Sequence, residues 1–178
     1  TAYTIIDSTY SGIHSESTYF VPLGQNFEYW RLKLTNNTDK TRKIIIFTYC
    51  EFTNQWDTYQ DQVNLQYSMF IIRGGLVNGN MLRIAIQDNL TPQTQKFFLH
   101  DIARHTWMTL VGSTVTGFDT SREAFLGMYG GYHQPRAVMN GNCTGSCAYG
   151  DNACGSLQTE VMLLPGESRE LLVLLGLG

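Results

Sequence analysis

The stretch FEYWRLKLTNNTDKTRKIIIFTYCEF, residues 27–52, decides the fold class of this chain. In its first part, Trp30, Leu32 and Leu34 alternate with polar or amphipathic neighbours, which is the period-two pattern of a half-buried strand. The residues NNTDK that follow are rich in side chains that hydrogen-bond to their own backbone, so they predict a turn. Residues 42–52 are β-branched and aromatic almost throughout and predict a second strand. The two strands and the turn together predict a β-hairpin.

Strand patterns continue along the rest of the chain, whereas helix patterns are scarce. Three further strands are predicted within LQYSMFIIR (65–73), MLRIAIQ (81–87) and HTWMTLVGS (105–113). A last hairpin is predicted where LQTEVMLL and RELLVLLG flank the turn PGES. One short helix is predicted in TSREAFLGMY, because Thr120 and Glu123 have the spacing of a capping box. Many short strands joined by turns predict an all-β protein, an antiparallel β-sandwich with one or two short helices.

Length and composition indicate a single folded domain. A chain of 178 residues can bury roughly two thirds of its unfolded surface in one core. Hydrophobic residues form 43% of the chain and charged residues 15%, which excludes a disordered chain. The formal net charge is -3 and no basic run could bind a phosphate backbone, so we expect no nucleic-acid partner. The longest apolar run, LLVLLGLG, is far shorter than the ~20 residues that span a bilayer, so no membrane segment is predicted.

Three of the four cysteines lie in the glycine-rich stretch GNCTGSCAYGDNACGSLQ, residues 141–158. Cys143 and Cys147 have a spacing found in zinc sites, but a second pair is missing. Cys154 stands alone, and Cys50 could be a fourth ligand only if the fold brought it near. A disulfide is a second interpretation, and reduced structural thiols are a third. Four cysteines are few for a secreted scaffold of this length, which favours a reducing compartment and predicts a cytoplasmic location.

A complete active site would require catalytic side chains within this chain. The carboxylates closest to exposed-looking aromatic residues are Glu51, Asp57 and Asp61, beside Trp56 and Tyr59. Paired carboxylates next to aromatic residues are typical of a glycosidase, but carboxylates close in sequence are mostly solvated loop residues. The chain also contains four scattered histidines without a nucleophile motif or a metal-ligand spacing, His14, His100, His105 and His133. We therefore expect no catalytic residue and no metal ligand here.

The connection NQWDTYQDQVNLQYS, residues 54–68, joins two strongly hydrophobic segments although it contains few apolar residues. Long polar connections of this kind are usually functional. Of the three tryptophans, Trp30 and Trp107 fall in apolar strands and are expected in the core, whereas Trp56 is expected to be exposed in this connection. Exposed aromatic rings can form a platform for sugar rings. One functional hypothesis is therefore an autonomous carbohydrate-binding β-sandwich module without catalysis.

Several long motifs resemble a single family. They are YFVPLGQNFEYWRLKLTNNTDKTRKIIIFTYCEF, VTGFDTSREAFLG, GDNACGSLQ and the final LLPGESRELLVLLGLG, and they cover nearly all 178 residues. In this order they resemble the N-terminal β-sandwich domain of the inverting disaccharide phosphorylases related to cellobiose phosphorylase, glycoside hydrolase family 94. The resemblance implies a sandwich of the supersandwich type. It also favours structural thiols over a zinc site or a disulfide, because relatives carry a glycine- and asparagine-rich loop at residues 141–158.

In that family the sandwich is followed by a helical linker and an (α/α)6 barrel that holds the catalytic groups. The resemblance implies that residues 1–178 are a single sandwich domain of a longer protein, without its first strands, its linker and its barrel. The implied reaction is phosphorolysis, in which phosphate attacks the anomeric carbon of a β-glucoside while a carboxylic acid protonates the leaving oxygen, giving α-glucose 1-phosphate. Inorganic phosphate is the expected co-substrate, and no cofactor is expected.

The resemblance also implies a sugar site shared between two subunits. In family members the segment corresponding to residues 54–68 reaches across a homodimer and lines the neighbouring subunit's sugar pocket. Where relatives read Asn-Phe-Gln-Arg, this chain reads NLQY at residues 64–67, so the glutamine matches and an uncharged phenol replaces the guanidinium. The expected ligand is a β-linked glucose disaccharide or oligosaccharide. The expected substrate-binding residues are Gln66, Tyr67, Asn64 and Trp56.

Overall fold

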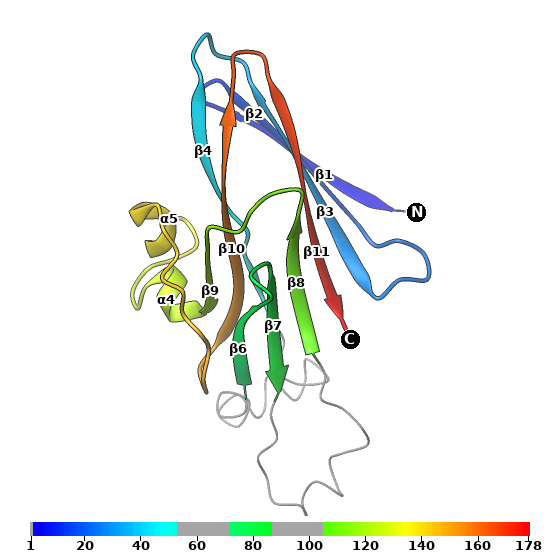
Figure 1. The fold of residues 1–178 in the computed structure, drawn as a ribbon, viewed down its shortest axis with the longest axis vertical. Helices are drawn as coiled ribbons and strands as arrows, with labels where there is room; N and C mark the ends of the chain where they lie inside the picture. The colour runs from blue at the N-terminus through cyan, green and yellow to red at the C-terminus, as the bar shows by residue number, and fades with distance from the viewer. Residues whose placement is uncertain (1, 53–71, 87–104) are drawn as a thin grey trace, which may run out of the picture.

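The computed structural model describes residues 2–52, 72–86 and 105–178, which form two antiparallel sheets and two short helices (Figure 1). The strands are β1 Tyr3–Tyr10, β2 Ile13–Phe20, β3 Phe27–Asn36, β4 Arg42–Phe47, β5 Cys50–Glu51, β6 Ile72–Val77, β7 Met81–Ile86, β8 His105–Val111, β9 Gly117–Ser121, β10 Ala153–Leu163 and β11 Ser168–Leu177. The helices are α4 Arg122–Leu126 and α5 Arg136–Asn140. One sheet has the order β1-β2-β3-β11-β8-β7-β6, and in the other β10 pairs with β4, β5 and β9. The predicted antiparallel sandwich with one or two short helices is confirmed.

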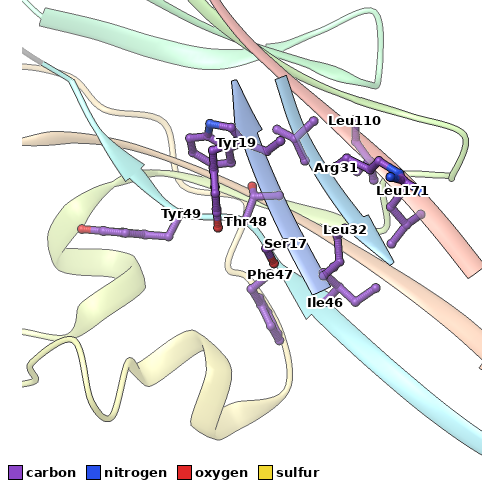
Figure 2. Close-up of a pocket in the computed structure, with 12 residues that line it drawn as sticks. Ser17, Tyr19, Arg31, Leu32, Ile46, Phe47, Thr48, Tyr49, Leu110 and Leu171 are labelled. Atoms are coloured by element: carbon purple, nitrogen blue, oxygen red, sulfur yellow. The ribbon is translucent and has the colours of Figure 1, made fainter. Parts of the chain in front are cut away.

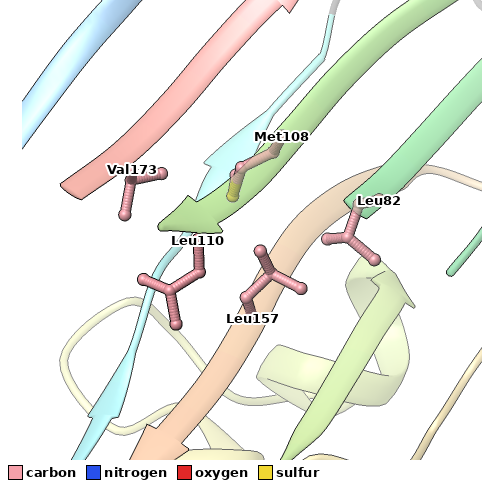
Figure 3. Close-up of a cluster of buried hydrophobic side chains, with 5 residues drawn as sticks. All are labelled: Leu82, Met108, Leu110, Leu157 and Val173. Carbon is pink, nitrogen blue, oxygen red and sulfur yellow. The ribbon is translucent and has the colours of Figure 1, made fainter. Parts of the chain in front are cut away.

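The two sheets pack their apolar faces against each other. In one core cluster, Leu82, Met108, Leu110 and Val173 come from the seven-stranded sheet, and Leu157 comes from β10 of the smaller sheet (Figure 3). Leu82, Met108 and Leu157 are fully buried. Burying one side chain of this size contributes ~1.5–3 kcal/mol to folding. Contacts between the two sheets therefore stabilise the sandwich.

The hairpin predicted within residues 27–52 is not formed, because its two strands belong to different sheets. β3 pairs with β2 and β11, whereas β4 pairs with β10. Leu34 of β3 and Ile44 of β4 instead contribute to the same core cluster between the sheets. The connection between them is an arch that crosses the roughly 10 Å between packed sheets. Residues 42–52 also divide into β4 and β5, which pair with successive parts of β10.

The hairpin predicted at residues 157–176 is an arch as well. Both strands form, but β10 pairs with β4, β5 and β9, while β11 pairs with β3 and β8. The physical reason is the same in both arches: alternation shows which face of a strand is buried, but not which strand lies beside it. Asn36 links the arches, because its carbonyl accepts a hydrogen bond from Gly166 N at 2.8 Å and its N–H donates to Glu167 O at 3.0 Å.

Two tight hairpins form where a residue with positive φ precedes a glycine. Ser11 and Gly12 have φ values of 49° and 77° between β1 and β2, and Asn78 and Gly79 have values of 52° and 76° between β6 and β7. Positive φ at both central residues is typical of type I′ turns, for which Asn-Gly is a preferred sequence. The Asn78-Gly79 pair is therefore a direct sequence signal for this hairpin. Of the strand predicted at 65–73, only the last two residues are described, and they begin β6.

The predicted helix forms as α4, with its N-cap one residue later than expected. The Ser121 hydroxyl accepts the capping hydrogen bond from Ala124 N at 3.4 Å. Thr120, the predicted cap, instead accepts from Ala148 N at 2.7 Å. Phe125 of α4 is buried beside Phe47 and Tyr49, so the helices cover the face of the smaller sheet that points away from the larger one. Within the described parts, no helix has the length and apolar character needed to cross a membrane.

The two tryptophans expected in the core lie on opposite faces of the seven-stranded sheet. Trp30 packs against the core cluster of Leu110 and Val173, which confirms the prediction for this residue. The prediction for Trp107 is wrong: its side chain lies on the outer face, with its ring centroid 6.2 Å from that of Phe27. Gly176 of β11 makes this possible, because a Cβ at that position would clash with the indole ring. The sequence HTWMTLV has apolar residues on both faces, so its pattern does not distinguish them.

Candidate functional site

The residues expected to bind sugar lie outside the described parts of the chain. These residues are Trp56, Asn64, Gln66 and Tyr67. The same holds for Asp57, Tyr59, Asp61 and His100. The described structure reaches Phe52, immediately before this connection, and therefore includes Glu51, the remaining candidate carboxylate.

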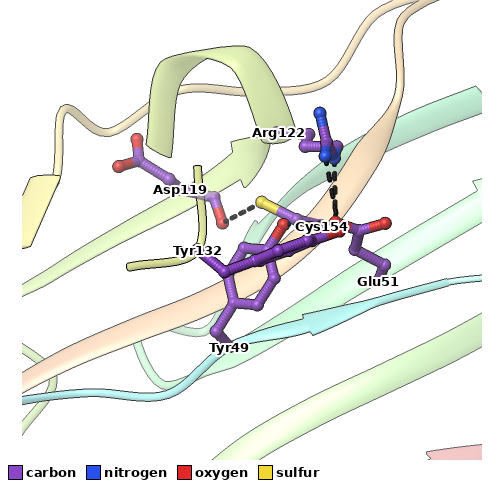
Figure 4. A network of polar contacts seen from close by, with 6 residues as sticks. All are labelled: Tyr49, Glu51, Asp119, Arg122, Tyr132 and Cys154. Carbon is purple, nitrogen blue, oxygen red and sulfur yellow. Dashed lines mark hydrogen bonds and ion pairs between the residues drawn. The ribbon is translucent and has the colours of Figure 1, made fainter. Parts of the chain in front are cut away.

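Glu51 is the centre of a polar cluster of four side chains, called here the Glu51 cluster (Figure 4). Glu51 Oε1 accepts hydrogen bonds from the hydroxyls of Tyr49 and Tyr132, both at 2.7 Å. Arg122 Nε donates to the same oxygen at 2.8 Å, and Arg122 Nη2 donates to the Tyr132 hydroxyl at 3.3 Å. Three separate stretches of the chain thus converge on one carboxylate oxygen.

The smaller sheet brings these side chains together. Glu51 is the last residue of β5, and Arg122 begins α4 directly after β9. Both β5 and β9 pair with the first residues of β10, so their ends meet at one end of the sheet. Tyr49 is held from two sides, since its ring stacks on Phe125 at 4.9 Å and meets Tyr132 edge-on at 6.1 Å between centroids.

These contacts change the acidity of the Glu51 cluster. Burial raises the pKa of the Glu51 carboxyl, but the hydrogen bonds from Tyr49, Tyr132 and Arg122 outweigh burial and lower this pKa below its ordinary value of 4.5. The hydrogen bonds with Tyr132 and Glu51 raise the pKa of Arg122. Burial and the hydrogen bond to Glu51 raise the pKa of Tyr49. At neutral pH the carboxylate and the guanidinium are therefore charged and the Tyr49 phenol is protonated.

The Glu51 cluster is suited to binding and positioning. Its carboxylate is stabilised in the charged form, which is the opposite of what a general acid at neutral pH requires. The side chains of Glu51 and Arg122 are 39% and 37% exposed, and Tyr132 is 64% exposed, so solvent reaches all three. Sequence reasoning singled out Glu51 but missed its partners, because Arg122 is 71 positions away and only the shared pairing with β10 brings it near.

A second carboxylate, Asp119 of β9, anchors the cysteine-rich stretch. Asp119 is fully buried. Its Oδ1 accepts hydrogen bonds from the backbone N–H groups of Thr144 and Ser146 at 3.1 and 3.0 Å, and from their hydroxyls at 2.6 and 2.7 Å. Oδ2 accepts a further bond from Thr144 N at 3.1 Å. The side chain satisfies several buried donors and fixes the path of the loop.

The cysteines of this stretch are held as thiols. Gln158 fixes the start of the loop, since its Oε1 accepts from Cys143 N at 2.7 Å and its Nε2 donates to Gly141 O at 3.3 Å. All four cysteines are free, and among the described residues no group of three or more side chains could hold a metal ion. Burial raises the pKa of Cys50 and of Cys143 to about 12, and it raises the pKa of Cys154 as well. A structural role therefore fits the packed thiols of Cys50, Cys143 and Cys154, whereas Cys147 is exposed.

Two of the three described histidines, His14 and His105, have local partners rather than a shared site. His14 Nε2 and Asp7 Oδ2 are 2.8 Å apart across the β1–β2 pair. The ring of His105 contacts the guanidinium of Arg83 at 3.0 Å on the neighbouring strand. Burial, followed by the positive charge of Arg83, lowers the pKa of His105. Neither histidine belongs to a group of metal-ligating side chains in the described parts.

Comparison with known proteins covers the whole chain. The family model described as "Glycosyl hydrolase 94, supersandwich domain" matches residues 1–178. The chain belongs to this family. The match confirms the family expected from the motifs. The two antiparallel sheets of this chain agree with a supersandwich domain.

Relatives of this family 94 domain include three phosphorylases. N,N'-diacetylchitobiose phosphorylase of Vibrio furnissii is 31% identical over 177 residues, which is 99% of this chain and 21% of that protein. Solabiose phosphorylase of Paenibacillus borealis is 25% identical over 169 residues, 93% of this chain and 20% of that protein. Cellobionic acid phosphorylase of Neurospora crassa is 25% identical over 166 residues, 93% of this chain and 19% of that protein. The chain spans about a fifth of the length of these relatives.

A solved structure also resembles this domain. It is a polysaccharide lyase that superposes with a TM-score of 0.51 at 12% identity, over 97% of this chain and 21% of the lyase. At this identity the similarity shows the fold alone.

Proposed function

We propose that this supersandwich domain is part of an inverting phosphorylase that cleaves a β-linked disaccharide with inorganic phosphate and no further cofactor. The observation that carries the proposal is the match of all 178 residues to the family 94 supersandwich, with 31% identity to a chitobiose phosphorylase. Since this chain spans about a fifth of such relatives, the catalytic groups belong to the remainder of the protein in this proposal. The low cysteine content favours a cytoplasmic location.

We propose a disaccharide of glucose or of N-acetylglucosamine as the substrate. The motifs favour a cellobiose-type substrate, whereas the relatives are named for N,N'-diacetylchitobiose, solabiose and cellobionic acid. The tyrosine at position 67, where the family resemblance implies an arginine, removes a charged and bidentate donor. This difference favours a neutral acceptor sugar over an acidic one.

The domain's proposed role is to support a homodimer and to present residues 54–68 to the sugar site of the neighbouring subunit. Gln66 would pair with a sugar hydroxyl, because an amide both donates and accepts hydrogen bonds. Tyr67, Asn64 and Trp56 complete the proposed contacts. Support comes from the NLQY motif and from the Glu51 cluster, which holds the strand end from which this connection leaves.

Phosphorolysis by the full-length protein tests this function. The purified protein is incubated with phosphate and either cellobiose or N,N'-diacetylchitobiose, and the anomeric proton of the product is followed by NMR. The expected product is an α-linked sugar 1-phosphate from one of the two substrates, formed only when phosphate is present. The 178-residue chain alone serves as the control and should form none. Cleavage at the same rate without phosphate would contradict the proposal.

The alternative function, an autonomous carbohydrate-binding module, has a different signature. It predicts that the 178-residue chain binds cello-oligosaccharides by itself and that Trp56→Ala abolishes the binding. Calorimetry measures both effects. If the full-length protein shows no phosphate-dependent cleavage but the 178-residue chain binds cello-oligosaccharides, the function is carbohydrate binding and not phosphorolysis.

A further inference from the structure

A cleft of about 190 Å3 opens between the two sheets, next to β2, β3 and β4 (Figure 2). It exists because the sheets differ in width. Among the described residues, β4 is an edge of the smaller sheet and pairs with β10 alone, whereas the larger sheet continues beyond β3 to β2 and β1. Within the described parts of the chain, no strand therefore lies opposite the face of β2 that points toward the smaller sheet, and the cleft lies there.

Aromatic rings form one side of this cleft and aliphatic side chains form its base. Tyr19 and Trp30 stand on one side, with their rings edge to face and their centroids 5.8 Å apart. Phe47 and Tyr49 border the cleft from the smaller sheet, but their rings point away from it and pack against Phe125 of α4. The base consists of Leu110, Leu171 and Val173. Such surroundings suit a flat ring with apolar faces.

Three hydrogen-bonding groups of the lining lack a side-chain partner in the described structure. They are the hydroxyls of Ser17 and Tyr19 and the indole N–H of Trp30. The Trp30 N–H is buried, and a buried donor without an acceptor is unfavourable. Because the Tyr19 ring packs against Trp30, a shift of this ring would open the N–H to an oxygen atom of a ligand. The cleft thus combines apolar surfaces with unused donors.

The described residues leave the cleft no charged group available for a ligand. Arg31 is the only charged residue in the described lining, and its guanidinium is paired with Glu170 of β11. A phosphate or carboxylate would therefore find no counter-charge. The volume is below the ~300 Å3 at which sites for drug-sized ligands begin, so it limits the ligand to one ring.

We propose that this cleft binds a single neutral pyranose ring, glucose or N-acetylglucosamine. An apolar face of the sugar ring lies against Tyr19 and Trp30, and its hydroxyl oxygens pair with Ser17, Tyr19 and the Trp30 N–H. The inference is independent of the phosphorylase function proposed above, because binding to this cleft requires no turnover.

An NMR titration of the chain with 15N-labelled indole groups tests the proposal. Glucose or N-acetylglucosamine should shift the Trp30 indole resonance, assigned with Trp30→Phe, with a Kd on the order of millimolar. The Trp107 resonance should not move, because Trp107 lies on the opposite face of the sheet. Glucose 1-phosphate should bind at least about five-fold more weakly than glucose, because the cleft provides no cation to balance the phosphate.

Ser17→Leu should weaken glucose binding by about ten-fold or more, because it fills the cleft and removes a hydroxyl. Ser15→Leu is the matched control, since Ser15 lies on the same face of β2 but outside the lining. The proposal is wrong if neither sugar shifts Trp30, if Trp107 shifts equally, if glucose 1-phosphate binds as tightly as glucose, or if Ser17→Leu binds normally. If Ser17→Leu does not fold, the Trp30 and Trp107 indole resonances of the unmodified chain still test the proposal.

Discussion

The side-chain amide of Asn36 donates a hydrogen bond to the carbonyl of Leu163 at 3.0 Å, although these residues are 127 positions apart. The same Nδ2 reaches the carbonyls of Lys40 and Leu164 at 2.8 and 3.2 Å. Oδ1 accepts from the backbone N–H and the hydroxyl of Thr38 at 3.0 and 2.7 Å. A single, fully buried side chain thus ties the β3–β4 arch to the β10–β11 arch.

Replacement of Asn36 should destabilise the whole sandwich. Asn36→Ala removes these bonds and leaves buried carbonyl and N–H groups unpaired, so we expect the free energy of unfolding to fall by about 3 kcal/mol. Urea denaturation measures this change. Asn37→Ala, at the exposed neighbouring position, should change it by less than about 0.5 kcal/mol. Equal effects of the two substitutions would show that the arches do not depend on Asn36.

Removal of the Asp119 carboxylate should release the cysteine-rich loop. Asp119→Ala leaves the N–H groups of Thr144 and Ser146 without their acceptor, so we expect a loss of about 3 kcal/mol in stability and faster hydrogen exchange at these amides. Asp39→Ala, at an exposed position, is the matched control and should alter neither quantity. Unchanged exchange at the two amides in Asp119→Ala would contradict the anchoring role.

Stability should fall in alkaline solution because of the buried thiols. Cys50 and Cys143 have folded-state pKa values of about 12 against an ordinary value of 9.0, so the unfolded chain loses these protons first. Their contribution is fully present below pH 9 and is lost as the pH rises toward 12, by up to about 1.4 kcal/mol per pH unit for each thiol. Urea denaturation between pH 8.5 and 11 should show a shallower pH slope for Cys50→Ala. Cys147→Ala, at the exposed cysteine, should keep the slope of the unmodified chain.

The hydrogen bond from Tyr132 should be measurable in the titration of Glu51. Tyr132→Phe removes one of three donors to Glu51 Oε1, so the pKa of the carboxyl should rise toward its ordinary value. Carboxyl 13C NMR measures the titration. Tyr129→Phe is the control, because Tyr129 is 96% exposed and makes no contact with Glu51 in the described structure. Because the cluster is partly exposed, solvent screening should keep the loss of stability below about 1 kcal/mol. A Glu51 pKa that does not rise in Tyr132→Phe would show that this bond is absent in solution.

Gln66 is the residue on which the proposed sharing of a sugar site depends. In the full-length protein, Gln66→Ala should lower kcat/KM for the accepted disaccharide by about ten-fold, which corresponds to ~1.4 kcal/mol. Folding and dimerisation should be unaffected. Gln60→Ala, in the same polar connection, provides a control that should keep normal kinetics. If Gln66→Ala has the same kcat/KM as the unmodified protein for every accepted disaccharide, Gln66 is a solvated loop residue.

The sequence predicted the positions of the strands well, but it predicted poorly which strands pair with each other. Period-two alternation placed Trp30 and Leu34 on a buried face, because alternation follows directly from the geometry of a single strand. Pairing depends on which other segment fits against the strand edge, and residues 27–52 contain no information about β10 or β11. The Glu51 cluster was missed for the same reason, since Arg122 approaches only after β9 pairs with β10. The sugar contacts assigned to Gln66 and its neighbours remain predictions.

The arches also determine the order in which the sheet can be completed during synthesis. β3 pairs along one edge with β2, which precedes it, but its other edge pairs with β11, and Arg31 and Glu170 on these strands are 139 positions apart. At ~5–20 residues per second, the ribosome takes roughly 7 to 28 s to produce the intervening chain. Throughout that interval the β1–β2–β3 segment carries an open strand edge, which is a template for pairing with another nascent chain. Synthesis of β11, the ten-residue strand that covers this edge of β3, therefore ends the period in which that edge is open.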